Sequence, residues 1–196
     1  MLKAIIAAKN QNSCDAIADI VMECGFPSIK TVLTGLEVRE KFTYTDFDLV
    51  VLYAPLEDEF GLELIADLSK ITSAAIIIIT KGDIAEDVQK KVSFAGAFAL
   101  SRPVNKAMLS QAVRFAMMAR EERIKLKAAN EELQLKMNEL KLIDRAKCVL
   151  IQYLRITENQ AHRHIQKQAM DQRLPQVAIA KDILRTYESF ESKADS

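Results

Sequence analysis

The sequence lacks, or holds few of, the residues that mark several large classes of protein. Its 196 residues include no tryptophan, five glycines, four prolines and three cysteines. So little glycine and proline excludes collagen-like and low-complexity chains. The cysteines, Cys14, Cys24 and Cys148, are odd in number and not closely paired, so we expect reduced thiols. His162 and His164 have no cysteine nearby, and we expect no zinc site, no other metal and no cofactor.

Long apolar runs are absent as well. The run at 74–79 has six residues, whereas a helix that crosses a bilayer needs about 20. The segment 1–9 is short and carries lysine too early for a signal peptide. We therefore expect a cytoplasmic protein with no membrane partner.

The chain has no net charge, but its two halves differ in sign. Residues 1–110 hold 11 basic and 15 acidic side chains, and residues 111–196 hold 16 basic and 12 acidic ones. Opposite charges in the two halves predict two modules, of which the basic one is the better candidate for a polyanionic partner.

The first half alternates short apolar runs with segments of helical periodicity. The expected strands are at 2–8, 29–33, 48–53, 75–80 and 96–101, and the expected helices are at 15–24, 35–42, 62–69 and 83–94, with another helix opening at Asn105. Five strand–helix repeats predict a doubly wound α/β domain, with a parallel five-stranded sheet and helices on both faces. Functional residues of such folds lie just after the carboxyl ends of the strands.

The segment 48–64, with Thr80 and Arg102-Pro103, resembles a response-regulator receiver domain, and the resemblance covers about residues 2–118. It implies a flavodoxin-like fold and a receiver-like domain over 1–118. The family's phosphate-accepting aspartate is replaced by Tyr53, and its magnesium-binding acidic pair falls on Ala8 and Lys9. The family's lysine falls on Arg102, whereas Thr80 keeps the family's hydroxyl.

These replacements bear directly on the chemistry. Aspartyl phosphorylation needs a carboxylate nucleophile and a Mg²⁺ ion, which in turn needs carboxylate ligands. We therefore expect Ala8, Lys9, Tyr53, Thr80 and Arg102 to form a pocket that is not phosphorylated, with Tyr53 a packed residue. A substitute acceptor, either Asp58 or Tyr53 itself, is the alternative.

The middle of the chain predicts one long helix, because 105–142 contains no proline or glycine and is rich in strong helix formers. Three leucines recur every seven residues and occupy the d positions of a heptad repeat, of which Ala119 is the first d position. The residues at the d and a positions are Ala119, Leu126, Leu133 and Leu140, and Ala116, Arg123, Asn130 and Met137, respectively. This pattern predicts a coiled-coil linker over 119–142 and a homodimer. The alternative is a helix that packs on the receiver-like domain or is solvated.

The last part of the chain predicts a small three-helix module over 143–187 and a polar tail over 188–196. The module holds eight basic and four acidic residues, which suits contact with phosphates. Charge alone leaves solvated helices equally well supported. The candidate RNA-binding residues, chosen by charge and helical spacing, are Arg145, Lys147, Arg163, His164, Lys167, Arg173 and Lys181.

The order of residues in this module resembles the ANTAR domain of transcription-antitermination regulators. The residues that carry the resemblance are Asp144-Arg145-Ala146-Lys147, Thr157-Glu158, Ala161, Ile165, Ala169, Val177-Ala178 and Ile183. Cys148 stands where the family usually has glycine. The resemblance implies a dimer that binds paired hairpins in leader RNA and prevents a terminator from forming. A related regulator has a receiver-like domain that is controlled by a partner protein, so such a partner is expected here.

Two other functions stay open on the sequence alone. The chain could be a signalling protein phosphorylated at a non-standard acceptor, or a coiled-coil interaction protein that binds no specific RNA. We expect no enzyme, since the sequence has no glycine-rich phosphate loop, no nucleophile–base pattern and no metal cluster.

Overall fold

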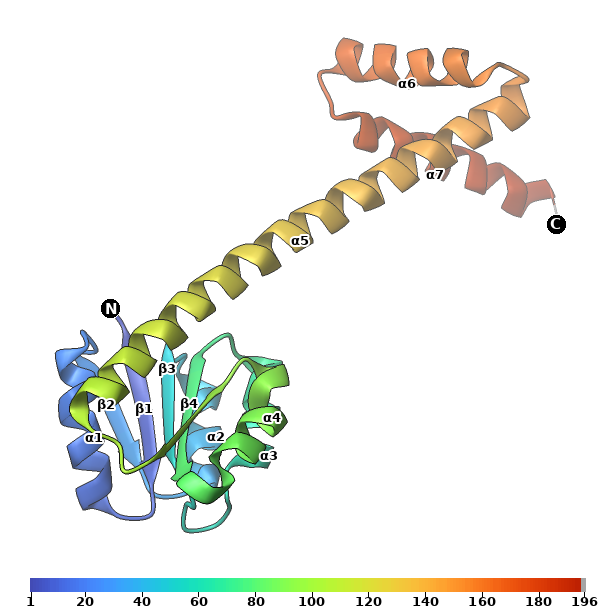
Figure 1. Cartoon of the computed structure of the whole chain (residues 1–196). Coiled ribbons are helices and arrows are strands. Elements are labelled where there is room, and N and C mark those ends of the chain that lie inside the picture. The colour runs from blue at the N-terminus through green and yellow to red at the C-terminus, as the bar shows by residue number, and fades with distance from the viewer. Residues whose placement is uncertain (195–196) are drawn as a thin grey trace. The chain divides into compact units, whose positions relative to one another are not determined.

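The computed structural model describes the backbone of residues 1–194 and the side chains of residues 1–187 (Figure 1). The chain divides into two compact units, Met1–Leu126 and Lys127–Ser196. The side chains of the expected polar tail at 188–196 lie outside the described residues. No helix in the described part of the chain is both long and apolar enough to cross a membrane.

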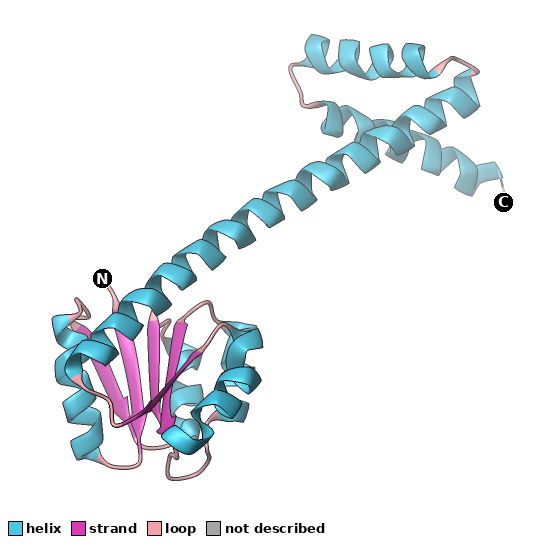
Figure 2. Cartoon of the chain, in the orientation of Figure 1, coloured by secondary structure: helices cyan, strands magenta, loops and turns pink. Residues whose placement is uncertain are grey.

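The first unit is an α/β domain in which helices flank one sheet (Figure 2). Its strands lie in the order β2-β1-β3-β4-β5. Its elements are β1 (Lys3–Ala8), α1 (Gln11–Glu23), β2 (Ser28–Val32), α2 (Gly35–Tyr44), β3 (Leu49–Tyr53), α3 (Leu62–Ile71), β4 (Ala75–Lys81), α4 (Ala85–Val92) and β5 (Phe98–Arg102), with single turns at Gly82–Ile84 and Ser93–Ala95. All the strand pairs are parallel. The expected five-stranded doubly wound fold is confirmed.

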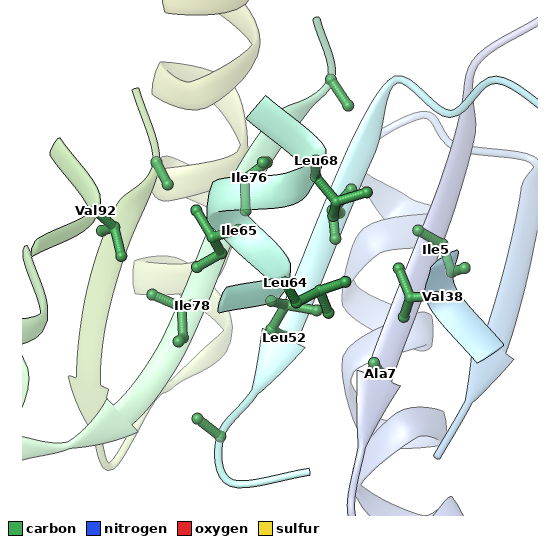
Figure 3. Packing of buried hydrophobic residues seen from close by; sticks show 14 of the residues in the cluster. Ile5, Ala7, Val38, Leu52, Leu64, Ile65, Leu68, Ile76, Ile78 and Val92 are labelled. Carbon is green, nitrogen blue, oxygen red and sulfur yellow. The ribbon is translucent and has the colours of Figure 1, made fainter. Parts of the chain in front are cut away.

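The apolar runs form strands because they are buried on both faces of the sheet. On one face, Ile5, Leu52 and Ile78 pack against α2, α3 and α4 (Figure 3). On the other face, the alternate residues, such as Ile6 and Ile77, pack against α1 and the start of α5. Residues of both faces are fully buried in β1, β3 and β4.

The first helix begins earlier than the expected 15–24. It begins at Gln11, because the side chain of Asn10 accepts a hydrogen bond of 2.9 Å from the backbone N–H of Ser13. Such an N-cap satisfies a donor that the helix leaves free. The polar residues after β1 therefore form the first turn of α1 rather than a loop.

The helix α5 (Lys106–Leu154) is continuous for 49 residues, so the long helix expected over 105–142 extends without a break to Leu154. In the first unit Ala116 is buried against the sheet. The guanidinium of Arg123 donates to the backbone carbonyls of Ala95 and Ala74 at 3.0 and 3.5 Å. These two heptad a positions are thus used inside the first unit, in agreement with the alternative of a packed helix for this part of α5.

The second unit contains the end of α5, α6 (Glu158–Gln172) and α7 (Gln176–Ala194). Its core is small. The buried residues are Ala146, Leu150, Ala161, Ile165, Ala169, Ile179, Ala180, Ile183 and Leu184. Thr157 is the N-cap of α6 and forms a reciprocal capping box with Gln160.

Candidate functional sites

The residues of the predicted degenerate pocket lie together at one edge of the sheet. Ala8, Tyr53 and Arg102 are the last residues of β1, β3 and β5, and Thr80 is the next-to-last residue of β4. Lys9 follows β1 and is exposed. The parallel topology places all these carboxyl ends at the same edge, as the sequence predicted.

Tyr53 and Arg102 contact each other at this edge. The guanidinium carbon of Arg102 lies 4.8 Å from the centre of the Tyr53 ring, a cation–π geometry. One terminal nitrogen of Arg102 donates to the carbonyl of Ala54 at 3.1 Å. Tyr53 is therefore packed under a cation.

The same edge does not fit the Mg²⁺ ion that receiver domains use. Ala8 offers no donor atom, and Lys9 places a cation where Mg²⁺ would need carboxylates. The Thr80 hydroxyl is fully buried and has no hydrogen-bond partner among the residues that the structure describes. Across the same residues, no group of three metal-ligating side chains comes together.

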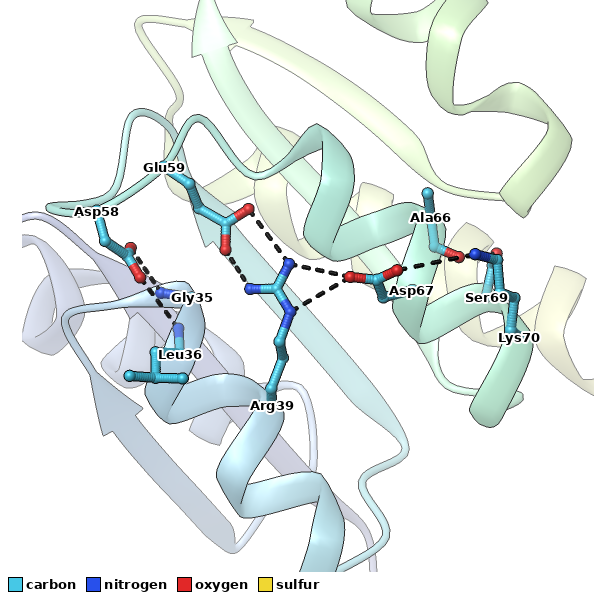
Figure 4. Close-up of polar contacts among 9 residues, drawn as sticks. All are labelled: Gly35, Leu36, Arg39, Asp58, Glu59, Ala66, Asp67, Ser69 and Lys70. Carbon is cyan, nitrogen blue, oxygen red and sulfur yellow. Dashed lines mark hydrogen bonds and ion pairs between the residues drawn. The ribbon is translucent and has the colours of Figure 1, made fainter.

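Asp58, the alternative phosphate acceptor, forms hydrogen bonds that hold a loop in place (Figure 4). Its carboxylate accepts hydrogen bonds from the backbone N–H groups of Gly35 and Leu36, at 2.8 and 3.1 Å, at the start of α2. Burial alone would raise the pKa of the Asp58 carboxyl, but these N–H groups outweigh it, so the pKa lies below its ordinary value. Asp58 thus anchors the loop after β3 to α2.

A second anchor of this loop is Arg39. Figure 4 shows its guanidinium between the carboxylates of Glu59 and Asp67. The distance to Asp67 is 3.1 Å. Asp58 and Glu59 therefore connect the loop to α2, and Arg39 in turn connects α2 to α3 through Asp67.

The candidate RNA-binding residues of the second unit lie on all three of its helices. Arg163 and Lys167 are one turn apart on α6, on the face opposite to the buried Ile165. The imidazole of His164 contacts the Gln168 amide at 3.1 Å. Arg173 ends α6 with φ 54°, in the left-handed region. Arg145 on α5 and Lys181 on α7 are also exposed.

Lys147 differs from the other candidates because its charge is neutralised within the unit. Its ammonium lies 2.8 Å from the Asp144 carboxylate and 3.1 Å from that of Glu158. Its side chain is 16% exposed. Hydrogen bonds to Asp144 and then to Glu158 raise the pKa of Lys147. This side chain connects α5 to the start of α6.

A groove in the second unit brings the candidate Arg145 together with residues that sequence reasoning did not select. Its volume is about 530 Å³, and Lys141, Arg145, Tyr153 and Tyr187 are among its lining residues. The two tyrosine rings are 4.8 Å apart. Both tyrosines stand among apolar residues in the sequence, a pattern that is typical of a core. Aromatic faces beside cations suit an unpaired nucleobase and its phosphate.

The comparisons with known proteins agree with this division of the chain. Residues 131–184 match the family model of the ANTAR domain. No curated protein sequence matches the chain. The first unit resembles a CheY-like receiver domain protein from Methanospirillum hungatei, with 21% identity, a TM-score of 0.56 and coverage of 63% of this chain and 98% of that one.

Two further solved structures are similar. A receiver domain protein from Clostridium thermocellum has 22% identity and a TM-score of 0.54, covering 64% of this chain and 98% of that one. A two-component response regulator from Clostridium difficile has 20% identity and a TM-score of 0.52, covering 60% of this chain and 97% of that one. At these identities the likeness establishes the fold.

The chain therefore combines a receiver-like domain of CheY-like fold with an ANTAR domain. The ANTAR match implies RNA binding in transcription antitermination for residues 131–184, and the receiver-like fold fits the N-terminal part of a response regulator.

Proposed function

We propose that this chain acts as a homodimer that binds paired hairpins in leader RNA and prevents a terminator from forming. In this proposal a protein partner contacts the receiver-like unit, over residues 1–118, and controls the regulator without aspartyl phosphorylation. The ANTAR match over residues 131–184 is the observation that carries the proposal.

The surface of the second unit supports RNA binding. Arg163, Lys167 and Lys181 are exposed, and none of them forms an ion pair with a carboxylate in the described part of the chain. Such cations hold the phosphate backbone, while unpaired loop bases provide sequence specificity. The groove at Tyr153 and Tyr187 supplies an aromatic surface for such a base.

The middle of α5 supports the homodimer. Leu126, Leu133 and Leu140 follow the heptad spacing and are 68%, 65% and 62% exposed in the single chain. Burying one leucine side chain contributes roughly 1.5–3 kcal/mol. Asn130 lies at an a position between them, where an asparagine favours a two-stranded coiled coil in register.

The sheet edge supports control without phosphorylation. The position of the nucleophile is a tyrosine packed under Arg102. The residues that would hold Mg²⁺ offer no carboxylate. What remains of the receiver-like unit is a folded surface to which a partner protein can bind.

The RNA part of the proposal is tested with a two-hairpin leader RNA and a scrambled RNA of the same length. We expect selective binding that weakens with salt. Lys167→Ala should weaken it and reduce the salt slope by about one unit, whereas the control Lys70→Ala, an exposed cation of the first unit, should change neither. Equal binding to both RNAs would favour a coiled-coil interaction protein instead.

The dimer is tested by sedimentation of the full chain. Leu133→Asn should convert the dimer to monomer, because it removes an apolar side chain from both helices of the coiled-coil seam. The matched control Leu36→Asn replaces an equally exposed leucine of α2 and should leave the dimer intact. A wild-type chain that sediments as a monomer at all concentrations would refute the dimer.

A further inference from the structure

A second groove lies in the first unit, beside the packed Tyr53 and Arg102. Its volume is about 540 Å³, within the range of about 300–1,000 Å³ that is typical of small-molecule sites. Its lining includes Ser13, Ile17 and Ile20 from α1, Tyr53, Arg102, and Leu109 from α5. The phosphorylation chemistry discussed above uses none of the α1 or α5 residues.

Arg102 is the charged group of this groove. One of its terminal nitrogens binds the Ala54 carbonyl, and its guanidinium rests on the Tyr53 ring. Its Nε is buried and has no acceptor within the described residues. A buried donor without a partner is unfavourable, and no ion pair neutralises this guanidinium in the part of the chain described. The Arg102 side chain is thus held in place by two contacts, while its Nε–H has no acceptor in that part of the chain.

The electrostatics of the edge favour an anion. Receiver domains place acidic residues here, but this chain has Ala8 and the exposed cation Lys9 after β1. Of the three acidic residues in the loop that follows β3, Asp58 binds α2, Glu59 binds Arg39 and Glu57 is exposed to solvent, and none of them lines the groove. The cation Arg102 therefore faces a groove without a competing carboxylate among its lining residues.

The walls of the groove are apolar. Ile17 and Ile20 on α1, Ile79 at the end of β4 and Leu109 on α5 contribute aliphatic side chains. Ser13 contributes a hydroxyl. An apolar cavity with a few convergent polar groups is typical of sites for small organic molecules.

We propose that this groove binds a small organic anion, a molecule with one carboxylate and a flat apolar body. The carboxylate pairs with the guanidinium of Arg102, which presents planar donors suited to such a group. The apolar body lies between α1 and the first turns of α5. The bound molecule contacts Leu109 on the helix that continues along the chain into the ANTAR domain, so the receiver-like unit gains a chemical input that needs no phosphoryl transfer.

Two probes with the same apolar body and different charge test the proposal on the full chain. They are 2-naphthoate and the neutral 2-naphthalenemethanol, each titrated while backbone amide signals are followed by NMR. We expect 2-naphthoate to shift signals of α1, residues 102–104 and the start of α5, and to bind about tenfold more tightly than the alcohol, because only the anion pairs with Arg102.

Three variants locate the site. Arg102→Gln should remove the preference for the anion, and Ala16→Phe, which adds bulk at an exposed position of the groove lining, should weaken both probes. Lys81→Gln removes an exposed cation at the end of β4 that does not line the groove, and it should change neither.

The proposal is overturned if wild-type chain binds the two probes equally, or if the shifted signals lie elsewhere. It is also overturned if 2-naphthoate binds Arg102→Gln as well as wild type. Should Arg102→Gln fail to fold, the two probes on wild type and the Ala16→Phe variant still decide the question.

Discussion

The two units of this chain, the receiver-like first unit and the ANTAR-containing second unit (the ANTAR unit), differ in the size of their cores and in the charges on their surfaces. The receiver-like unit has a large core in which β1, β3 and β4 are buried on both faces, but its sheet edge has lost its carboxylates. The ANTAR unit has a small core built around four alanines, and its surface carries exposed cations. A core formed by whole strands persists when the residues at the strand ends change, whereas a small helical core leaves little margin.

The largest expected effect comes from the same truncation in each unit. Ile165→Ala and Ile77→Ala each remove the side chain of a fully buried isoleucine, at a loss of about 2–5 kcal/mol. We expect Ile165→Ala to unfold the ANTAR unit and abolish RNA binding, while Ile77→Ala leaves the receiver-like unit folded with a lower midpoint. Urea unfolding followed by circular dichroism and limited proteolysis separates the two. Equal unfolding of both units would contradict the comparison.

A smaller effect is expected at the tyrosine groove of the ANTAR unit. Tyr153→Leu keeps apolar volume but removes the aromatic face, so discrimination between the leader RNA and the scrambled RNA should fall by about 1–3 kcal/mol. Binding to the scrambled RNA should stay unchanged, because it depends on the cations. The control Tyr44→Leu alters an exposed tyrosine of the first unit. Unaltered discrimination in Tyr153→Leu would show that this groove does not take a base.

The smallest effect concerns Asp58 in the receiver-like unit. Asp58→Ala should destabilise this unit by about 1 kcal/mol, because two N–H groups at the start of α2 lose their acceptor. The neighbouring exposed Glu57, replaced by alanine, serves as the control.

The pH dependence of this effect has a definite sign. The pKa of Asp58 is lower in the folded chain than its ordinary value, so its contribution is complete above about pH 3.9. It is lost as the pH falls through the lower folded-state pKa. Thermal unfolding at several pH values should therefore show the difference between wild type and Asp58→Ala shrinking only in acid. A difference that does not depend on pH would show that the carboxylate charge is not involved.

The fold was predictable because its strands are continuous apolar runs. Such a run can be recognised in the sequence without knowing which elements pack against it. The sheet edge was predictable for a related reason, since parallel topology alone brings Tyr53, Thr80 and Arg102 together. Helix boundaries were less so. The early start of α1 depends on one side-chain hydrogen bond from Asn10, and α5 continues past residue 142 because nothing in its sequence breaks it.

The contacts that sequence reasoning did not predict join residues that are far apart in the chain. Arg123 fits a heptad position, but its hydrogen bonds go to carbonyls 28 and 49 residues earlier. Lys147 was chosen for its charge, and its ion pair with Glu158 depends on how α5 meets α6. The Tyr153–Tyr187 pair likewise joins two helices. A local pattern shows which side chains are available but not which of them meet.

In the proposed function the ANTAR unit acts on leader RNA and the receiver-like unit does not need phosphorylation. Single-round transcription through a two-hairpin leader and its terminator tests this directly. One sample is untreated chain, and the other is chain incubated with acetyl phosphate and Mg²⁺. The intact mass of the chain is measured after the incubation. We predict that untreated chain raises read-through and that the incubation changes neither its mass nor its activity. Read-through that appears only after a phosphoryl group is added would contradict the account. If Tyr53→Phe still gained that mass, the acceptor would be another residue, such as Asp58.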